Sequence, residues 1–432
     1  MADPSVARLM RRRDCLILQT ARAKIRDKGF VFAMSPLVIH NAKIIGQTGI
    51  QTGGVLIRDG QVEQVFAENE TPTGLNRAES IDLQGNYLSS GLIDIHIHGS
   101  AGIDVQATDE NGLAKLSEFL LSEGVTAYFP TLVPTDDRGY SEALATINSY
   151  VERQNQQKSA AGQGARILGV HFEGPFVNEH RCGALRTRYF RKYDGDPRSV
   201  EQFTGERSEV ARLMTLAPET ERGLDLIRDL NARGVRTFIG HSQADPRTLD
   251  ESAGAGARHI THFPNALDPL HHRKPGAVAW GLVQNEITLD CIADFHHVDP
   301  LMLRLVYQSK GADRIALISD AIMPAGLGDG EFEVWDERII VRDGRTSLAE
   351  SPGTLAGSVI HLRQAVKNIT DIGVPINEAV RMATQIPARS SGVQSQYGSI
   401  EVGKKADLIG FNGDFAMRLA VVDGKVAFSN VD

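Results

Sequence analysis

The chain has 432 residues and a formal net charge of −8, so its composition gives no sign of a basic surface that binds nucleic acid. No apolar run approaches the roughly 18 residues of a membrane-spanning helix, and three scattered cysteines (Cys15, Cys182 and Cys291) argue against a disulfide framework. We therefore expect a cytoplasmic protein without nucleic-acid or membrane partners, long enough for a large α/β barrel with a small addition.

Residues 1–34 carry an excess of Arg and Lys. The apolar stretch at 15–18 is too short for the hydrophobic region of a signal peptide. We expect a peripheral basic extension, or a true start of translation at Met34.

Short alternating apolar runs near both ends of the chain predict strands. They cover 37–45, 54–66, 406–413 and 419–428. Asp59-Gly60 and Asp423-Gly424 lie within these runs and are hairpin signals. We therefore predict one small β-sandwich domain built from residues 35–88 and 395–432.

Strands and helices alternate in the middle of the chain, between residues 89 and 394. Helices are expected near 109–122, 137–156, 219–232, 358–371 and 377–388. Eight apolar runs precede or separate the helix-length intervals, and they lie at 93–98, 125–130, 165–173, 213–217, 235–241, 259–262, 287–293 and 314–320. Eight strands with right-handed helical crossovers predict a (β/α)₈ barrel, so the fold class is α/β.

The first barrel strand contains a His-x-His pair. Ile93, Ile95 and Ile97 alternate with Asp94, His96 and His98, which is the period of a strand, so both imidazoles point to the same side. Two such nitrogens can bind one metal ion, although two histidines that merely end a buried strand fit the same pattern.

Other polar residues also end apolar runs, and together they favour a metal site over two histidines that merely end a buried strand. The carboxyl ends of parallel barrel strands share one mouth, so residues more than 200 positions apart can meet there. Imidazoles with a carboxylate suit zinc or ferrous iron, and a carboxylate can bridge two ions. The candidates are His96, His98, Glu173, His241, His262 and Asp320.

Asp320 ends the last of these strands and has a separate predicted role. A carboxylate beside a metal-activated water can accept its proton and pass that proton to a leaving nitrogen. The pattern therefore favours amide hydrolysis.

Several passages resemble the N-acetylglucosamine-6-phosphate deacetylase family of the amidohydrolase superfamily, from about residue 37 to the end. Glu173-Gly-Pro-Phe176 and Gly353-Thr-Leu-Ala-Gly-Ser358 are the passages that favour this family over other amidohydrolases. The remaining matches are 91–99, 240–242, 261–266, 271–276, 319–321 and 398–407.

The resemblance implies that Glu173, His241 and His262 bind a principal divalent ion and that His96 and His98 bind a second, with Glu173 as bridge. Asp320 matches the general base and acid. The family also implies a phosphorylated amino sugar as substrate, contacted by Asn265, Ala266 and His297. It further implies a homodimer in which Arg273 reaches the partner's site.

Two departures from the family pattern concern the substrate pocket rather than the metal ligands. Leu185 stands where the family typically has a histidine, and Phe295 stands where it usually has Gly. Leu185 cannot hydrogen-bond a sugar hydroxyl, and the Phe295 ring is expected to narrow the phosphate end. The open alternatives are a deacetylase of another N-acylated hexosamine or related amide, and a non-catalytic scaffold with the same fold.

Overall fold

The computed structural model describes residues 35–73, 75, 78–156, 164–204 and 211–431. The basic extension at 1–34, including Cys15 and Met34, lies outside the described residues. The predictions made for it therefore stay predictions.

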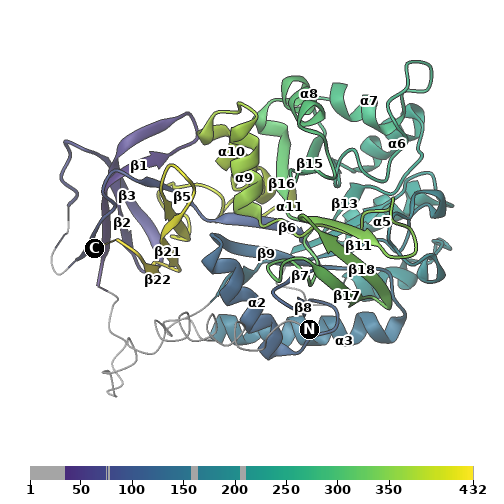
Figure 1. Cartoon of the computed structure of the whole chain (residues 1–432), viewed down its shortest axis with the longest axis horizontal. Helices are drawn as coiled ribbons and strands as arrows, with labels where there is room; N and C mark the ends of the chain where they lie inside the picture. The colour runs from purple at the N-terminus through teal and green to yellow at the C-terminus, as the bar shows by residue number, and fades with distance from the viewer. Residues whose placement is uncertain (1–34, 74, 76–77, 157–163, 205–210, 432) are drawn as a thin grey trace. The chain divides into compact units, whose positions relative to one another are not determined.

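Strands from both ends of the chain belong to one sheet, whose purple and yellow strands are neighbours in Figure 1. The central strand β1 pairs with β2, β4 and β5, and β5 pairs with β20. The strands are β1 (Leu37–Ile45), β2 (Ile50–Arg58), β3 (Gln61–Ala67), β4 (Glu79–Asp82), β5 (Tyr87–Ser90), β20 (Leu408–Phe411), β21 (Met417–Val422) and β22 (Lys425–Ser429). The sandwich arrangement and its limits at residues 88 and 395 stay predictions.

Both predicted hairpin turns are present in this sheet. Asp59 and Gly60 have φ of 48° and 79°, and Asp423 and Gly424 have φ of 49° and 72°. Positive φ at both central residues matches the twist of the flanking strands, which is why Asp-Gly is favoured there. The local sequence therefore sets the register of these two hairpins.

A nearly closed barrel of eight parallel strands follows, as predicted. The strands are β6 (Leu92–Ile97), β9 (Val125–Leu132), β11 (Gly169–Glu173), β12 (Ala211–Leu216), β13 (Val235–Ile239), β14 (His259–Ile260), β15 (Thr288–Ile292) and β16 (Ile315–Ile318). The Asp320 amide donates to the His96 carbonyl at 2.9 Å, and a bridge joins Ile97 to Ala321. These contacts bring the first and last strands together.

Every residue of β6 is buried, because one face lines the barrel and the other lies under helices. Its three isoleucines pack into the main hydrophobic core, whereas His96 and His98 occupy the other face. The alternation along this strand therefore places the isoleucines in the hydrophobic core and the histidines on the opposite face, where they can form a site.

Aspartate side chains cap the start of three of the described helices. The Asp109 and Asp245 side chains accept hydrogen bonds from the backbone amides of Gly112 and Thr248, and Asp299 caps α8 in the same manner. The helices are α2 (Glu110–Ser122), α3 (Asp137–Gln156), α4 (Glu201–Thr204), α5 (Gly223–Ala232), α6 (Pro246–Ala255), α7 (Gly276–Val283), α8 (Pro300–Lys310), α9 (Leu362–Asp371), α10 (Ile376–Met382) and α11 (Gln385–Ser391).

Several details differ from the predictions, and the helix expected from 358 begins only at Leu362. The helix expected from 219 begins only at Gly223, because Arg222 has a left-handed backbone with φ of 56°. The helix expected at 377–388 is divided into α10 and α11, because Thr384 leaves helical geometry. The antiparallel strands β17 (Gly330–Val334), β18 (Glu337–Arg342) and β19 (Arg345–Leu348) were not predicted.

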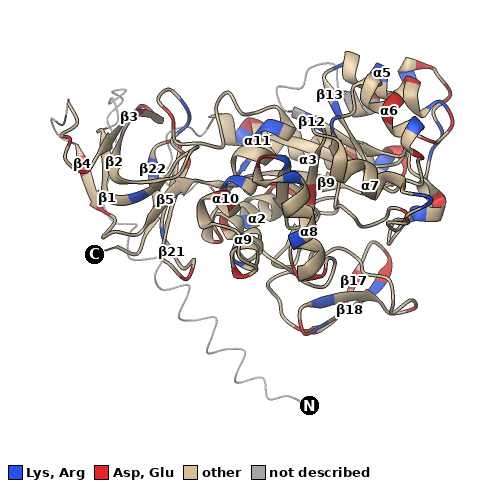
Figure 2. Cartoon of the chain, turned by 90° about the horizontal axis from the view of Figure 1, so that it is seen from above, with Lys and Arg blue, Asp and Glu red and all other residues tan. Residues whose placement is uncertain are grey.

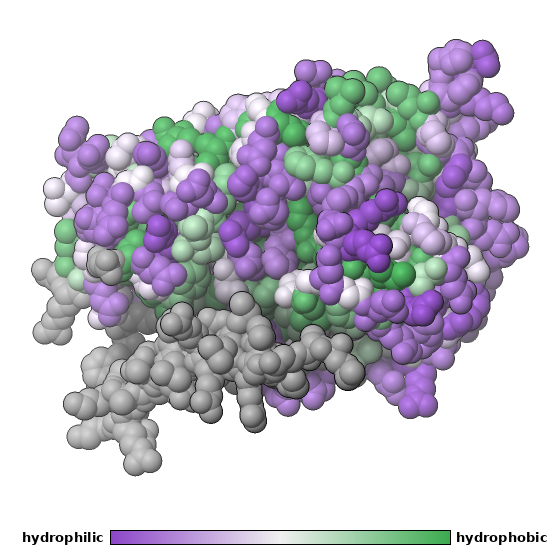
Figure 3. Space-filling model, in the orientation of Figure 1, coloured by the Kyte–Doolittle hydropathy of each residue, from purple (hydrophilic) through white to green (hydrophobic). Residues whose placement is uncertain are grey.

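The surface combines charges of both signs. Lys and Arg lie among Asp and Glu along the helices and loops (Figure 2). Hydrophilic residues cover most of the visible face in Figure 3, with hydrophobic residues between them. No helix in the described part of the chain is long and apolar enough to span a bilayer.

The end sheet is joined to the barrel by a largely buried ion pair. Arg166 Nη2 lies 2.6 Å from Asp423 Oδ2, with side chains 9% and 13% exposed. Replacing Arg166 with Met should lower the free energy of unfolding by about 3 kcal/mol, because Asp407 and Asp423 then lose a buried positive charge. Chemical denaturation measures the change.

The matched control is Arg138→Met, which removes an ion pair to Glu142 whose side chains are 84% and 65% exposed. Its effect should stay below about 1 kcal/mol. Equal losses in the two variants would contradict a stabilising role for the Arg166–Asp423 pair.

Candidate metal centre

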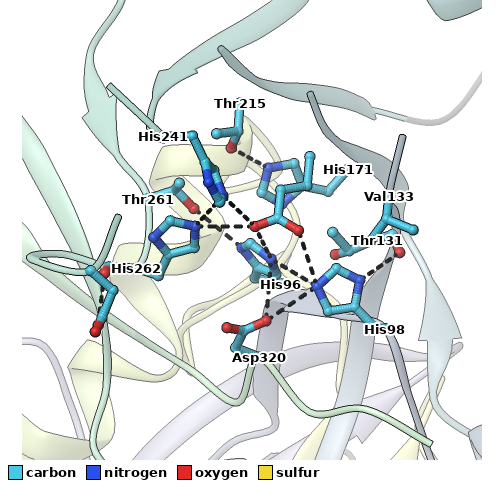
Figure 4. Close-up of polar contacts among 12 residues, drawn as sticks. His96, His98, Thr131, Val133, His171, Thr215, His241, Thr261, His262 and Asp320 are labelled. Atoms are coloured by element: carbon cyan, nitrogen blue, oxygen red, sulfur yellow. Dashed lines mark hydrogen bonds and ion pairs between the residues drawn. The ribbon is translucent and has the colours of Figure 1, made fainter. Parts of the chain in front are cut away.

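Six polar residues meet at the carboxyl ends of the barrel strands. His96 lies in β6 and Glu173 ends β11, and the others follow β6, β13, β14 and β16 within one or two residues. None is more than 7% exposed. Figure 4 shows the imidazoles and the Asp320 carboxylate pointing toward one centre, where the six are His96, His98, Glu173, His241, His262 and Asp320.

The six residues form two groups, each with ligand atoms close enough to hold one ion. In the first group the His96 and His98 Nε2 atoms are 3.2 Å apart, and they lie 3.4 Å and 3.2 Å from Asp320 Oδ1. In the second group His241 Nε2 and His262 Nε2 are 3.0 Å apart, and each lies 3.0 Å from Glu173 Oε1.

Glu173 lies between the two groups. Its Oε1 faces His241 and His262, whereas its Oε2 is 3.4 Å from His98 Nε2. One carboxylate with an oxygen toward each group has the arrangement of a bridging ligand.

The donor chemistry of the two groups fits cations. His98 Nδ1 lies 3.0 Å from the Thr131 carbonyl, and His241 Nδ1 lies 2.7 Å from the Arg181 carbonyl. A carbonyl only accepts, so each Nδ1 carries a proton, and the neutral form of each ring would turn an Nε2 lone pair inward. These lone pairs face carboxylate oxygens, which are also acceptors, and a divalent cation satisfies both.

The electrostatics of the centre favour the same conclusion. Burial alone lowers the pKa of His98, but in the absence of a cation, hydrogen bonds and negative charge from Asp320 and Glu173 raise that pKa overall to about 10, so Nε2 takes up a proton where a cation would otherwise bind. Burial raises the pKa of Glu173, yet the neighbouring histidines, His96 foremost, hold it well below its usual value. The carboxylates therefore stay ionised and attract positive charge to the Nε2 atoms.

The backbone is strained at three of the six residues. His241, His262 and Asp320 have φ of 48°, 32° and 49°, in the left-handed region that non-glycine residues rarely adopt. Such strain persists where the surroundings over-determine a conformation, and it is frequent at functional sites. Here it turns the side chains inward directly after the strands end.

His171 is not one of the six, although it follows the same strand pattern. Its Nδ1 lies 2.9 Å from the Ile95 carbonyl and its Nε2 lies 2.8 Å from Thr215 Oγ1. Burial, and after it the charge of His96, holds its pKa well below the usual value. His171 is therefore a neutral core residue packed against His96.

A cavity of about 270 Å³ opens onto the centre. Asn265, Ala266 and His297 line it, together with five of the six polar residues, all except His96. The Asp294 carboxylate accepts from His297 Nδ1 at 2.7 Å, which leaves Nε2 as the remaining polar atom of that ring. Arg273 is exposed and does not line the cavity of its own chain.

Leu185 and Trp335 form an apolar part of the cavity wall. Trp335 lies in the tight turn between β17 and β18 and has a φ of 56°. Its ring lies edge-on to the His98 ring, with 5.1 Å between the ring centroids. Trp335 was not among the predicted site residues, because β17 and β18, which flank it, were not predicted. A tryptophan followed by Asp in a turn has no sequence signature of a binding residue.

Phe295 is the second departure from the family pattern. It is not among the cavity-lining residues, and its ring packs against the main hydrophobic core. Its φ is 66°, a conformation that glycine adopts most readily. The turn directs the side chain toward the core, so the expectation that this ring narrows or reshapes the phosphate end gains no support from the cavity lining and stays a prediction.

Comparisons with known proteins give consistent results. A sequence pattern described as the amidohydrolase family matches residues 312–427. An N-acetylglucosamine-6-phosphate deacetylase of Vibrio furnissii is 35% identical over 360 residues, which is 83% of this chain and 87% of that protein. An N-acetylgalactosamine-6-phosphate deacetylase of Escherichia coli O157:H7 is 34% identical over 341 residues, covering 79% and 87%.

A solved structure also superposes over most of the chain. It is a mutant N-acetyl-D-glucosamine-6-phosphate deacetylase of Mycobacterium smegmatis in complex with N-acetyl-D-glucosamine-6-phosphate. The TM-score is 0.81 at 25% identity, and the match covers 92% of this chain and 100% of the other.

Metal removal tests the centre directly. A chelator should lower the melting temperature of the protein, and Zn²⁺ should restore it, because a ligand at 100 times its Kd stabilises the folded state by about 2.7 kcal/mol. Glu173→Gln should greatly reduce this response, since Glu173 faces both groups. Differential scanning calorimetry with and without chelator measures it.

Glu378→Gln is the control, because Glu378 is half-buried and accepts from the Tyr307 hydroxyl away from the centre. It should respond to Zn²⁺ like the unchanged protein. A full response in Glu173→Gln would exclude Glu173 as a ligand.

Proposed function

Because the chain belongs to the N-acetylglucosamine-6-phosphate deacetylase family of amidohydrolases, we propose that it hydrolyses N-acetyl-D-glucosamine 6-phosphate to D-glucosamine 6-phosphate and acetate. The observation that carries this proposal is the 35% identity to a deacetylase over 83% of the chain. The reaction would serve amino-sugar catabolism. A cytoplasmic location remains a prediction from the cysteine pattern.

We propose that His96, His98, Glu173, His241 and His262 hold one or two divalent cations. Imidazole and carboxylate donors suit zinc, and ferrous iron is the next choice. When bound, such a cation polarises an amide carbonyl and lowers the pKa of a water molecule.

Asp320 is proposed to move the proton. Its carboxylate lies beside His96 and His98 at the open side of the centre and lines the cavity. It accepts a proton from the attacking water, whose oxygen bonds to the acetamide carbon. The same proton then passes to the sugar nitrogen as the C–N bond breaks, which releases acetate and the amine.

The substrate contacts form a second part of the proposal. Asn265, Ala266 and His297 line the cavity and would bind the sugar phosphate. Arg273 is exposed in its own chain, so its proposed contact with a phosphate requires a homodimer in which it reaches the partner's cavity. A guanidinium suits a phosphate dianion because it donates two parallel hydrogen bonds.

N-acetyl-D-galactosamine 6-phosphate is a second candidate substrate. The 34% identity to a deacetylase of that sugar is close to the 35% found for the glucosamine enzyme. Leu185 has no group that can hydrogen-bond a hydroxyl, so it supplies no polar preference between the two epimers.

The test is a substrate panel with acetate release as the readout. The panel contains the 6-phosphates of N-acetylglucosamine, N-acetylgalactosamine and N-acetylmannosamine beside the unphosphorylated sugars. We expect N-acetylglucosamine 6-phosphate to have the highest kcat/KM. A higher value for the galactosamine epimer would select the second candidate, and no turnover of any phosphorylated sugar would reject both.

Asp320→Asn should lower kcat by about 10²–10⁴-fold, because the amide cannot carry the proton. Metal content, measured by elemental analysis, should change little if the other five residues hold the cations. A scaffold protein would have no activity to lose. Unchanged kcat in this variant would remove Asp320 from the mechanism.

Arg273→Ala should raise KM for the phosphorylated sugar while kcat changes less, because the residue is proposed to bind the phosphate. Lys274→Ala is the neighbouring exposed control. Light scattering during chromatography measures the mass of the assembly. A monomer that retains full kcat/KM would refute the role of Arg273 in trans.

A further inference from the structure

A second buried polar cluster lies behind the metal centre, within the barrel. His259 in β14 and Asp290 in β15 are 1% and 0% exposed. His259 Nε2 lies 2.8 Å from Asp290 Oδ2, and because a carboxylate only accepts, this nitrogen donates. The ring is fixed from its other side by Thr288 Oγ1, 2.7 Å from Nδ1. Neither residue lines the cavity of the centre.

Asp290 is hydrogen-bonded to the backbone of a residue in the centre. Its Oδ1 accepts from the backbone amide of His262. His262 has φ of 32°, and its buried Nδ1 has no hydrogen-bond partner among the described residues. The strained backbone of His262 is thus anchored by Asp290, whereas its ring has no anchor of its own outside the centre.

The other three imidazoles of the centre are anchored differently. His98 and His241 donate from Nδ1 to backbone carbonyls, as described above. His96 Nδ1 lies 3.2 Å from Thr261 Oγ1, a contact drawn in Figure 4. Thr261 Oγ1 in turn lies 3.5 Å from Asp290 Oδ2. Asp290 therefore reaches both groups, directly at His262 and through Thr261 at His96.

We propose that Asp290 is a positioning residue for the whole metal centre. It keeps the His262 backbone turned inward and orients the Thr261 hydroxyl that holds His96, although it touches neither a cation nor the substrate. This inference rests on the proposed metal-dependent function. Residues that orient metal ligands typically change metal affinity or activity by 10–100-fold when they are removed.

Asp290→Ala should therefore weaken cation binding in both groups by about 10–100-fold. Asp290→Asn should retain most of the affinity of the group of Glu173, His241 and His262, because its amide oxygen can still accept from the His262 amide. It should not restore the other group, because an NH₂ in place of Oδ2 cannot accept from the Thr261 hydroxyl. Its NH₂ would face His259 Nε2, which can accept once its proton moves to Nδ1 beside Thr288. Recovery by this conservative variant separates a hydrogen-bonding role from a loss of packing.

Thr261 gives a second pair of variants that separates the two groups. Thr261→Val has nearly the same shape but no hydroxyl, so only the His96 anchor is lost. We expect weaker binding by about tenfold or more in the group of His96, His98 and Asp320, and little change in the other group. Thr261→Ser keeps the hydroxyl and should behave like the unchanged protein.

The experiment titrates the metal-free full chain with Co²⁺ in competition with a chelating dye, and records the visible Co²⁺ spectrum as a signature of coordination. The control is Gln154→Ala, because Gln154 is 5% exposed and bonds to the backbone of Ala165 and Ile167, neither of which belongs to the centre. This control should lose stability without losing Co²⁺ affinity.

The outcomes are distinguishable. If the unchanged protein binds no Co²⁺, the proposed metal-dependent function fails first. If it binds Co²⁺ and Asp290→Ala has the same affinity and spectrum as Gln154→Ala, the positioning role of Asp290 is wrong. If Asp290→Ala does not fold, equal Co²⁺ affinity in Thr261→Val and Thr261→Ser overturns the inference.

Discussion

The Glu173 carboxylate faces the Nε2 atoms of four histidines, at distances from 3.0 to 3.6 Å. In a buried site these lone pairs and negative oxygens repel one another unless a positive charge lies between them. The centre and a bound cation are therefore expected to stabilise each other. The remaining architecture serves to hold these acceptors in place.

The barrel supplies that restraint in two layers. The strand ends carry the six residues, three of them on a strained backbone. Beneath them, the rings are held by hydrogen bonds to Thr131, Arg181 and Thr261, and the His262 backbone by Asp290. Each of these hydrogen-bond partners belongs to a different strand or loop from the histidine that it orients. The histidines are therefore held in place only when the barrel strands have closed.

The cavity wall has a different origin from the centre. Leu185 lies in the segment after β11, and Trp335 lies in the turn between β17 and β18. Arg186 and Arg188 join these two segments through ion pairs to Asp336. The six polar residues of the centre lie at strand ends, whereas Leu185 and Trp335 of the cavity wall lie in segments that connect strands. Connecting segments can change without altering the strand ends, so the same reaction is compatible with cavity walls of different composition. The proposed reaction type therefore depends on the centre, and the proposed choice between sugar epimers depends on the wall.

The sequence by itself determined the eight barrel strands, both Asp-Gly hairpins and the strand-end positions of the six polar residues, because strand periodicity and turn chemistry are local signals. It did not reveal the β17–β19 sheet, the place of Trp335 in the wall, or the direction of the Phe295 ring. Only the tertiary structure decided those features and the contact of Asp290 with His262, because they depend on backbone turns and on hydrogen bonds between separate strands. Strand-end positions predicted that the six polar residues meet, but no local pattern encodes which side chains of neighbouring strands and loops contact them.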